Sequence, residues 1–151
     1  MRAVIQRTQT EAKVIVASET KGRIDKGLVI YLGVGKQDNE EDLLWIANKV
    51  VQLRIFSDEH GKMNKSVQDI GGGLLVISQF TLFASTKKGN RPSYMNSGPP
   101  EEANRLYEAF LLHLRENYDL VVKSGVFGAD MQVSFTNNGP VTIIIDSKNR
   151  E

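Results

Sequence analysis

The most prominent hydrophobic pattern is a run of ten mostly apolar residues, 74–83, between three glycines and a polar loop. A run rich in branched and aromatic residues and bounded in this way is typical of a strand buried on both faces. A second run of this kind covers 27–35. Its Gly33-x-Gly35 lacks the third glycine and the helix spacing of a dinucleotide-binding fingerprint, so we interpret it as a buried strand alone.

Shorter patterns predict further strands. Branched or alternating apolar runs cover 3–8, 12–17, 120–123, 131–136 and 141–146. We expect the first two to form a hairpin, followed by a turn at residues 20–22. We expect the last two to form another hairpin through the four residues 137–140. Residues 58–61 are interpreted as a turn and 63–70 as a polar connection.

Apolar residues at helical spacing predict two helices, 38–54 and 99–118. Asp38, with Glu41 three residues later, matches a capping box at the start of the first helix. The second helix opens with prolines and acidic residues, which helix first turns prefer. Helices mixed with strands indicate an α/β protein of the α+β type, and the length of 151 residues predicts a single domain, 1–151.

The composition limits which reactions and ligands the chain can support. The chain has no cysteine, which excludes disulfides and thiolate catalysis. The net charge of +1 argues against a general polyanion-binding surface but leaves room for a local basic patch. Such a patch is present, because residues 70–100 contain no acidic side chain and carry Lys87, Lys88 and Arg91. The loop is either an ordinary solvated segment or a set of RNA-phosphate contacts.

The first residues lack the apolar core of a signal peptide, and no apolar run approaches the roughly 18 residues of a membrane helix. We therefore expect a cytoplasmic protein with no membrane partner. A metal site is not expected, because His60 and His113 are far apart in sequence and no cysteine accompanies them.

Three polar residues interrupt the 74–83 run: Ser78, Gln79 and Thr81. A buried hydroxyl or amide without a partner costs about 1–3 kcal/mol. These groups therefore either bond to neighbouring backbone or mark a strand that ends at a pocket. The chain has no Gly-x-Ser-x-Gly elbow, and a hydroxyl without a base is a poor nucleophile. An enzyme built here would act by positioning and backbone donors.

Two motifs occur together: Ser78-Gln79-Phe80-Thr81-Leu82 and Asn138-Gly139-Pro140-Val141-Thr142. With the opening Val4-Ile5-Gln6-Arg7 and the segment 127–132, they closely resemble the D-aminoacyl-tRNA deacylase family. Order, spacing and length match over essentially the whole chain. One departure is Asn138, where the family is associated with an acidic residue before the glycine; asparagine is compatible with a turn.

The resemblance implies a homodimer with a β-barrel-like sheet and two flanking helices. The implied reaction is hydrolysis of the ester that joins a D-amino acid to the terminal adenosine of a tRNA. Glycyl-tRNA(Ala) is an implied second substrate. The terminal 2′-hydroxyl would assist the attacking water, and no cofactor or metal is implied.

The resemblance also assigns the rejection of L-amino acids. The Gly139–Pro140 bond would be cis and would project into the pocket of the partner subunit. There its two carbonyls would occupy the place of an L side chain, and rejection by a clash discriminates sharply. Arg7 would hold this loop.

The resemblance places catalysis at the other motif. The Phe80 and Thr81 N–H groups would face the developing oxyanion, and Ser78 and Gln79 would orient this segment. The terminal adenosine would lie against the segment that contains Phe127, Gly128, Ala129 and Met131, because flat aromatic rings stack on unpaired bases. Phe127 could instead be a core residue. Lys87, Lys88 and Arg91 would meet tRNA phosphates.

Two other classes remain open from the sequence. One is an esterase that uses Thr81 as a covalent nucleophile. The other is a non-catalytic module that binds RNA ends.

Overall fold

The computed structural model describes residues 1–151, with two α-helices, one short 3-10 helix and ten strands. The strands are β1 (Arg2–Thr8), β2 (Ala12–Val16), β3 (Glu19–Ile24), β4 (Gly27–Gly33), β5 (Phe56–Ser57), β6 (Met63–Lys65), β7 (Gly73–Ser78), β8 (Val121–Ser124), β9 (Gln132–Ser134) and β10 (Thr142–Asp146). The helices are α1 (Glu40–Gln52), the 3-10 helix η1 (Phe80–Phe83) and α2 (Pro100–Asn117).

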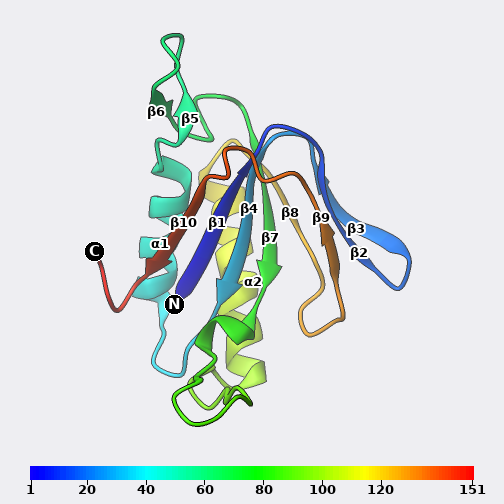
Figure 1. Ribbon diagram of the computed structural model, residues 1–151, viewed down its shortest axis with the longest axis vertical. Helices are drawn as coiled ribbons and strands as arrows, with labels where there is room; N and C mark the ends of the chain where they lie inside the picture. Colours follow the sequence, from blue (N-terminus) through cyan, green and yellow to red (C-terminus); the bar gives the residue numbers. More distant parts are fainter.

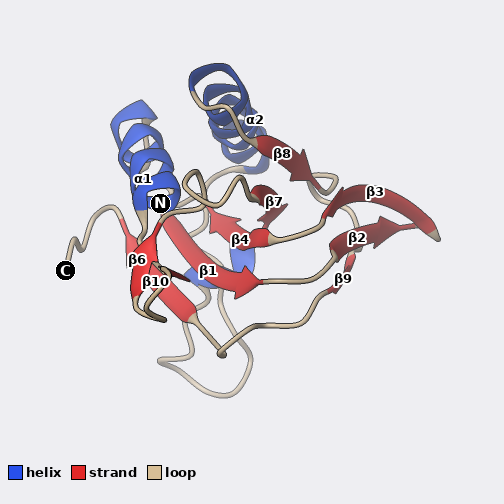
Figure 2. Ribbon diagram, turned by 90° about the horizontal axis from the view of Figure 1, so that it is seen from above, coloured by secondary structure: helices blue, strands red, loops and turns tan.

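A five-stranded sheet in the order β10-β1-β4-β7-β8 forms the centre of the molecule (Figure 1). β4, β7 and β8 run parallel, whereas β1 is antiparallel to both of its neighbours. Both α-helices cover one face of this sheet (Figure 2). The main core of 24 buried residues lies between the helices and the sheet, and it includes Ile5, Leu74 and Phe110.

A second sheet, β3-β2-β9, packs on the opposite face of β4 and β7. A cluster of six buried residues fills this contact, among them Val14, Leu75 and Ile77. β4 and β7 are therefore covered on both sides, as their continuous apolar sequences predict. On this face β1 and β10 carry no such layer, and Ile144 of β10 is 73% exposed.

The expected α/β class with two helices is confirmed. The expected barrel-like closure is not seen, because the strands divide among separate sheets of five, three and two strands with free edges. Both predicted hairpins are wrong. β1 and β2 belong to different sheets, as do β9 and β10. The predicted turn at 20–22 lies inside β3, because the chain turns at Ala17 and Ser18, which both have positive φ. Neither residue type signals such a turn.

Two boundaries also differ from expectation. The first helix is capped by Asn39, whose side chain accepts from the backbone of Asp42 while the Asp42 carboxylate accepts from Asn39 N–H. Asp38 instead accepts from Gly35 N–H and pairs with the α-amino group of Met1. The run 74–83 is not one strand, because β7 ends at Ser78 and the chain then enters η1.

The connection 63–70 contains β6, which pairs with β5. No helix is long and apolar enough to span a membrane.

Candidate active site at the carboxyl ends of the parallel strands

A cavity of about 730 Å³ lies beyond the carboxyl ends of β4, β7 and β8. Parallel neighbours end at the same edge of a sheet, so the segments that follow them converge there. The lining residues are Leu32, Val34, Lys36, Ile77, Ser78, Gln79, Phe80, Tyr94, Met95, Ser97, Gly98, Pro99, Pro100, Ala103, Phe127, Gly128, Ala129, Asp130, Met131 and Val133. A second cavity, of about 440 Å³, lies near Arg2 and Trp45 and contains none of the predicted site residues.

The first wall is the end of β7. Gln79 N–H donates to the Leu32 carbonyl at 2.8 Å and extends the strand pairing by one residue. The chain then turns into η1, which leaves the side chain of Phe80 57% exposed at the cavity. Phe80 and Thr81 open η1, and the first N–H groups of a helix have no partner within it. The wall therefore offers backbone donors beside the side chain of Ser78.

Thr81 differs from its neighbours because it does not line the cavity. Its hydroxyl accepts a hydrogen bond from Gln79 Nε2. The hydroxyl thus orients the amide of Gln79, which does line the cavity. Of the three polar residues at this strand end, Ser78 and Gln79 line the pocket and Thr81 supports Gln79.

The second wall is the connection between β8 and β9, which carries Phe127, Gly128, Ala129 and Met131. Phe127 is half-buried, and its ring lies 5.9 Å from the ring of Tyr107 in α2. The Tyr107 hydroxyl donates to the Val76 carbonyl at 2.9 Å. Burial raises the pKa of Tyr107 and keeps the donor protonated. Phe127 therefore belongs to the edge of the core and to the cavity at the same time.

The third wall was not predicted from the sequence. Tyr94 packs edge-on against Phe80 with ring centres 4.9 Å apart, and Ser97 Oγ donates to the Phe80 carbonyl at 3.1 Å. Gly98 N–H donates to the Val34 carbonyl at 2.9 Å, which ties this wall to the end of β4. Lys36 also lines the cavity. The available signal was topological, since Lys36 directly follows a buried strand.

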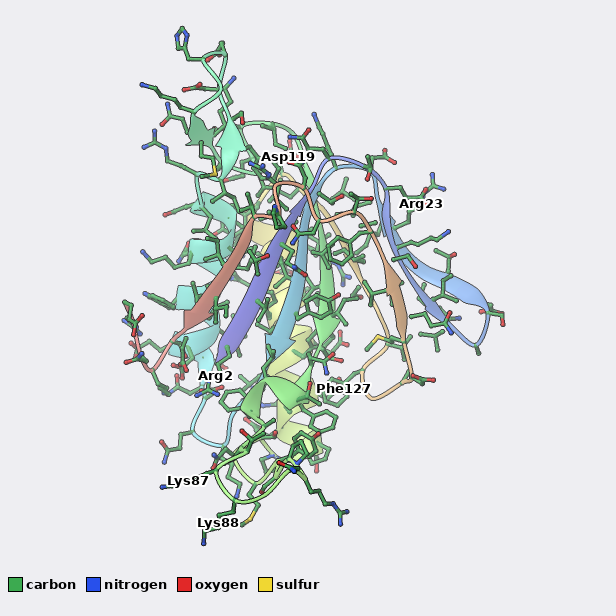
Figure 3. All side chains as sticks on the ribbon, viewed as in Figure 1. Arg2, Arg23, Lys87, Lys88, Asp119 and Phe127 are labelled. Atoms are coloured by element: carbon green, nitrogen blue, oxygen red, sulfur yellow. The ribbon has the colours of Figure 1, made fainter.

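Lys87, Lys88 and Arg91 lie outside the cavity, in the loop between η1 and α2. All three are exposed, and none forms an ion pair within the chain. Figure 3 shows Lys87 and Lys88 at the same end of the molecule as Phe127. The basic loop and the cavity therefore share one end of the fold.

The Gly139–Pro140 loop lies at the opposite end. Arg7 pairs with Leu28 at the beginning of β4, whereas the cavity lies beyond the end of β4. Arg7 N–H donates to the Val141 carbonyl at 3.2 Å, and the Arg7 carbonyl accepts from Asn138 N–H at 2.8 Å. The Gly139–Pro140 bond is cis, and both residues are exposed.

The guanidinium of Arg7 is buried behind this loop. Its Nη1 donates to the carbonyl of Ile55. A side chain on Gly139 would begin 3.2 Å from Arg7 Nη2. Arg7 is thus joined to the loop by two backbone hydrogen bonds, and its guanidinium lies close to Gly139. No cluster of three or more His, Asp or Glu side chains that could hold a metal ion occurs in the chain.

Comparison with known proteins connects these features. The family model described as D-Tyr-tRNA(Tyr) deacylase matches residues 4–146. The chain belongs to this family. A curated D-aminoacyl-tRNA deacylase from Thermosipho africanus is 55% identical over 148 residues, which are 98% of each chain. Another, from Cytophaga hutchinsonii, is 52% identical over 151 residues and the full length of both chains. The resemblance inferred from the motifs, and the enzyme class that it implied, are confirmed.

Two solved structures share the fold of this deacylase-family chain. One, described as c-Myc DNA Unwinding Element Binding Protein, is 40% identical with a TM-score of 0.91 and covers 97% of this chain and 98% of its own. The other, described as a probable eukaryotic D-amino acid tRNA deacylase, is 16% identical with a TM-score of 0.79 and covers 95% and 98%. At that identity the second match supports the fold alone.

Proposed function

We propose that this protein hydrolyses the ester bond of D-aminoacyl-tRNAs and releases the free D-amino acid and tRNA. The observation that carries the proposal is the joint placement of Ser78, Gln79 and Phe80 with Phe127 around one cavity at the strand ends. One wall supplies polar groups and backbone donors, and the other supplies an aromatic face. An aminoacyl ester on a terminal adenosine requires both.

In this proposal the N–H of Phe80, which lines the cavity, and the adjacent N–H of Thr81 at the start of η1 stabilise the oxyanion that develops on the ester carbonyl, whereas the Thr81 hydroxyl stays bonded to Gln79. Removal of one preorganised oxyanion-hole donor costs about 2.7–4 kcal/mol in a serine protease, which sets the scale for donors of this kind. Ser78 and Gln79 fix the segment, and the terminal 2′-hydroxyl of the tRNA assists the attacking water. Lys87, Lys88 and Arg91 meet tRNA phosphates, since accessible basic loops position nucleic acids without reading their sequence.

We further propose that the protein works as a homodimer and that the Gly139–Pro140 loop of one copy enters the cavity of the other. Within one chain the loop and the cavity lie at opposite ends of the five-stranded sheet. A two-fold axis across the open face of β1 and β10 would place the Gly139–Pro140 end of one copy beside the cavity end of the other. The exposed Ile144 on that face is a suitable apolar contact.

The loop carbonyls then occupy the position of an L side chain and reject it. A D side chain points elsewhere, and glycine has no side chain to clash. The proposal therefore includes glycyl-tRNA(Ala) as a second substrate.

Multiple-turnover hydrolysis tests the reaction itself. D-tyrosyl-tRNA in large excess over the protein should be deacylated through many cycles. Burst release limited to one equivalent would favour a Thr81 acyl-enzyme that does not turn over. Binding of tRNA without any hydrolysis would favour a nucleic-acid-binding module instead. The relative described as a DNA unwinding element binding protein gives that alternative a specific basis.

A further inference from the structure

The cavity contains only two charged side chains among its lining residues, Lys36 and Asp130. Lys36 is exposed and forms no ion pair, although eight other basic side chains of the chain do. Its nearest acidic neighbour along the chain, Asp38, is engaged with Gly35 N–H and with the α-amino group of Met1. A lone cation at the cavity is therefore available to a ligand.

The backbone at Lys36 is fixed in place. Its N–H donates to the Asn96 carbonyl at 3.2 Å, and Gly35 forms an isolated bridge with Ser97. These contacts join the end of β4 to the third wall. The ammonium group thus stands on a flexible stem above a constrained backbone. A long, flexible side chain of this kind can keep its charged group in water at the edge of the cavity and reach an anion that binds there.

One part of the proposed substrate has no partner among the residues described so far. A terminal adenosine that carries an aminoacyl ester has a base, an ester and a 5′-phosphodiester. Phe127 offers a face for the base, and the segment at Phe80 offers donors to the ester. The phosphodiester needs a cation, which neither of these walls provides. Pro99 and Pro100, at the uncapped N-terminus of α2, line the same cavity and add a partial positive charge.

We propose that Lys36 binds the phosphodiester that links the terminal adenosine to the preceding nucleotide. The inference rests on the proposed function and assigns Lys36 a role in specificity: it distinguishes an esterified polynucleotide end from other small D-amino acid esters. The basic loop with Lys87, Lys88 and Arg91 lies outside the cavity, so in this proposal it binds phosphates further from the ester.

Two synthetic esters test this role directly. The first is the D-tyrosyl ester of adenosine, and the second is the D-tyrosyl ester of adenosine 5′-methylphosphate, which adds only the phosphodiester. Wild-type protein should prefer the second by about tenfold in kcat/KM, through a lower KM, because hydrogen bonds to charged groups are worth about this factor. Lys36→Gln should abolish this preference, and Lys36→Arg should restore it.

Lys26→Gln is the matched control. Lys26 is also exposed and unpaired, but it precedes β4 whereas Lys36 follows it. This variant should keep the wild-type preference. With D-tyrosyl-tRNA as substrate, the salt dependence of KM should weaken in Lys36→Gln by about 0.7 in logarithmic slope, the value for one phosphate of a single strand.

The outcomes separate the two proposals. If both esters are hydrolysed and Lys36→Gln still prefers the phosphodiester, the Lys36 assignment is wrong and the proposed function stands. If Lys36→Gln loses activity equally on both esters, its role is structural and the assignment is again wrong. If wild-type protein hydrolyses neither these esters nor D-tyrosyl-tRNA, the proposed function fails and the inference fails with it.

Discussion

At the residue scale, Thr81 distinguishes the two hydrolytic mechanisms. Its hydroxyl accepts from Gln79 and does not line the cavity. A supporting role implies that Thr81→Ala loses about one hydrogen bond, which corresponds to about a fivefold decrease in kcat/KM. Removal of a covalent nucleophile lowers kcat on the order of 10⁶-fold in a serine hydrolase. Steady-state deacylation by Thr81→Ala, beside the exposed loop variant Thr86→Ala, measures which loss occurs.

Gly139 is a second residue with a clear expected effect. Its φ of +118° disfavours any side chain, and a Cβ would lie 2.7 Å from Val141 N. Gly139→Ala should therefore lower the free energy of unfolding by about 1–3 kcal/mol and weaken discrimination against L-esters. The control is Gly61→Ala, because Gly61 has φ +75° but nothing within 4 Å of the added Cβ. Equal urea midpoints for both variants would contradict the contact argument.

At the element scale, the start of α1 depends on a buried carboxylate. Burial alone would raise the pKa of Asp42, but hydrogen bonds from Lys148, Ser147 and Asn39 N–H outweigh it and hold that pKa below its ordinary value. A carboxyl group with a lowered folded pKa stabilises the protein above its unfolded pKa, about 3.9. This contribution is lost as the pH falls through the folded pKa.

Asp42→Asn should accordingly be less stable than wild type at pH 7, with the difference shrinking below about pH 4. Urea unfolding at pH 7 and at acid pH measures this change. Asp119→Asn serves as the control, because Asp119 is exposed and forms no ion pair. A stability difference that stays constant with pH would show that the lost hydrogen bonds, and not the charge, determine the effect.

The sequence predicted the elements better than their partners. The apolar runs located β4, β7 and both helices because burial on both faces or on one stripe leaves a local periodicity. The two predicted hairpins were wrong because β1 pairs with β10, at the other end of the sequence, and a local sequence pattern does not indicate which distant strand will be the partner. The boundary at Ser78 was missed because the residues of η1 are as apolar as the strand before them.

The same limit applies to the site. The motifs and the segment 127–132 singled out Ser78, Gln79, Phe80 and Phe127, and the structure places these four residues around one cavity; their roles there stay a prediction. The wall that contains Tyr94 joins the cavity through contacts with Phe80, and the polar, weakly patterned sequence of its loop gave no sign of this.

At the scale of the whole molecule, the open face of β1 and β10 is the proposed dimer contact. Ile144→Asp places a charge at the centre of that face, where Val4 and Ile144 pair across the two strands. We expect this variant to sediment as a monomer and to lose stereoselective deacylation. Leu112→Asp is the control, since Leu112 is 53% exposed on α2, in the helix layer on the other side of the sheet. A wild-type protein that is monomeric at working concentrations would contradict the shared site.

The central claim is that the protein is a hydrolase that selects by chirality. Its most direct test compares the deacylation of D-tyrosyl-tRNA and L-tyrosyl-tRNA, matched in all other respects, by catalytic amounts of the protein. We predict rapid turnover of the D-ester, with the L-ester decaying at its spontaneous rate. Hydrolysis of both esters would retain the active site but contradict the Gly139–Pro140 filter, and hydrolysis of neither would contradict the account as a whole.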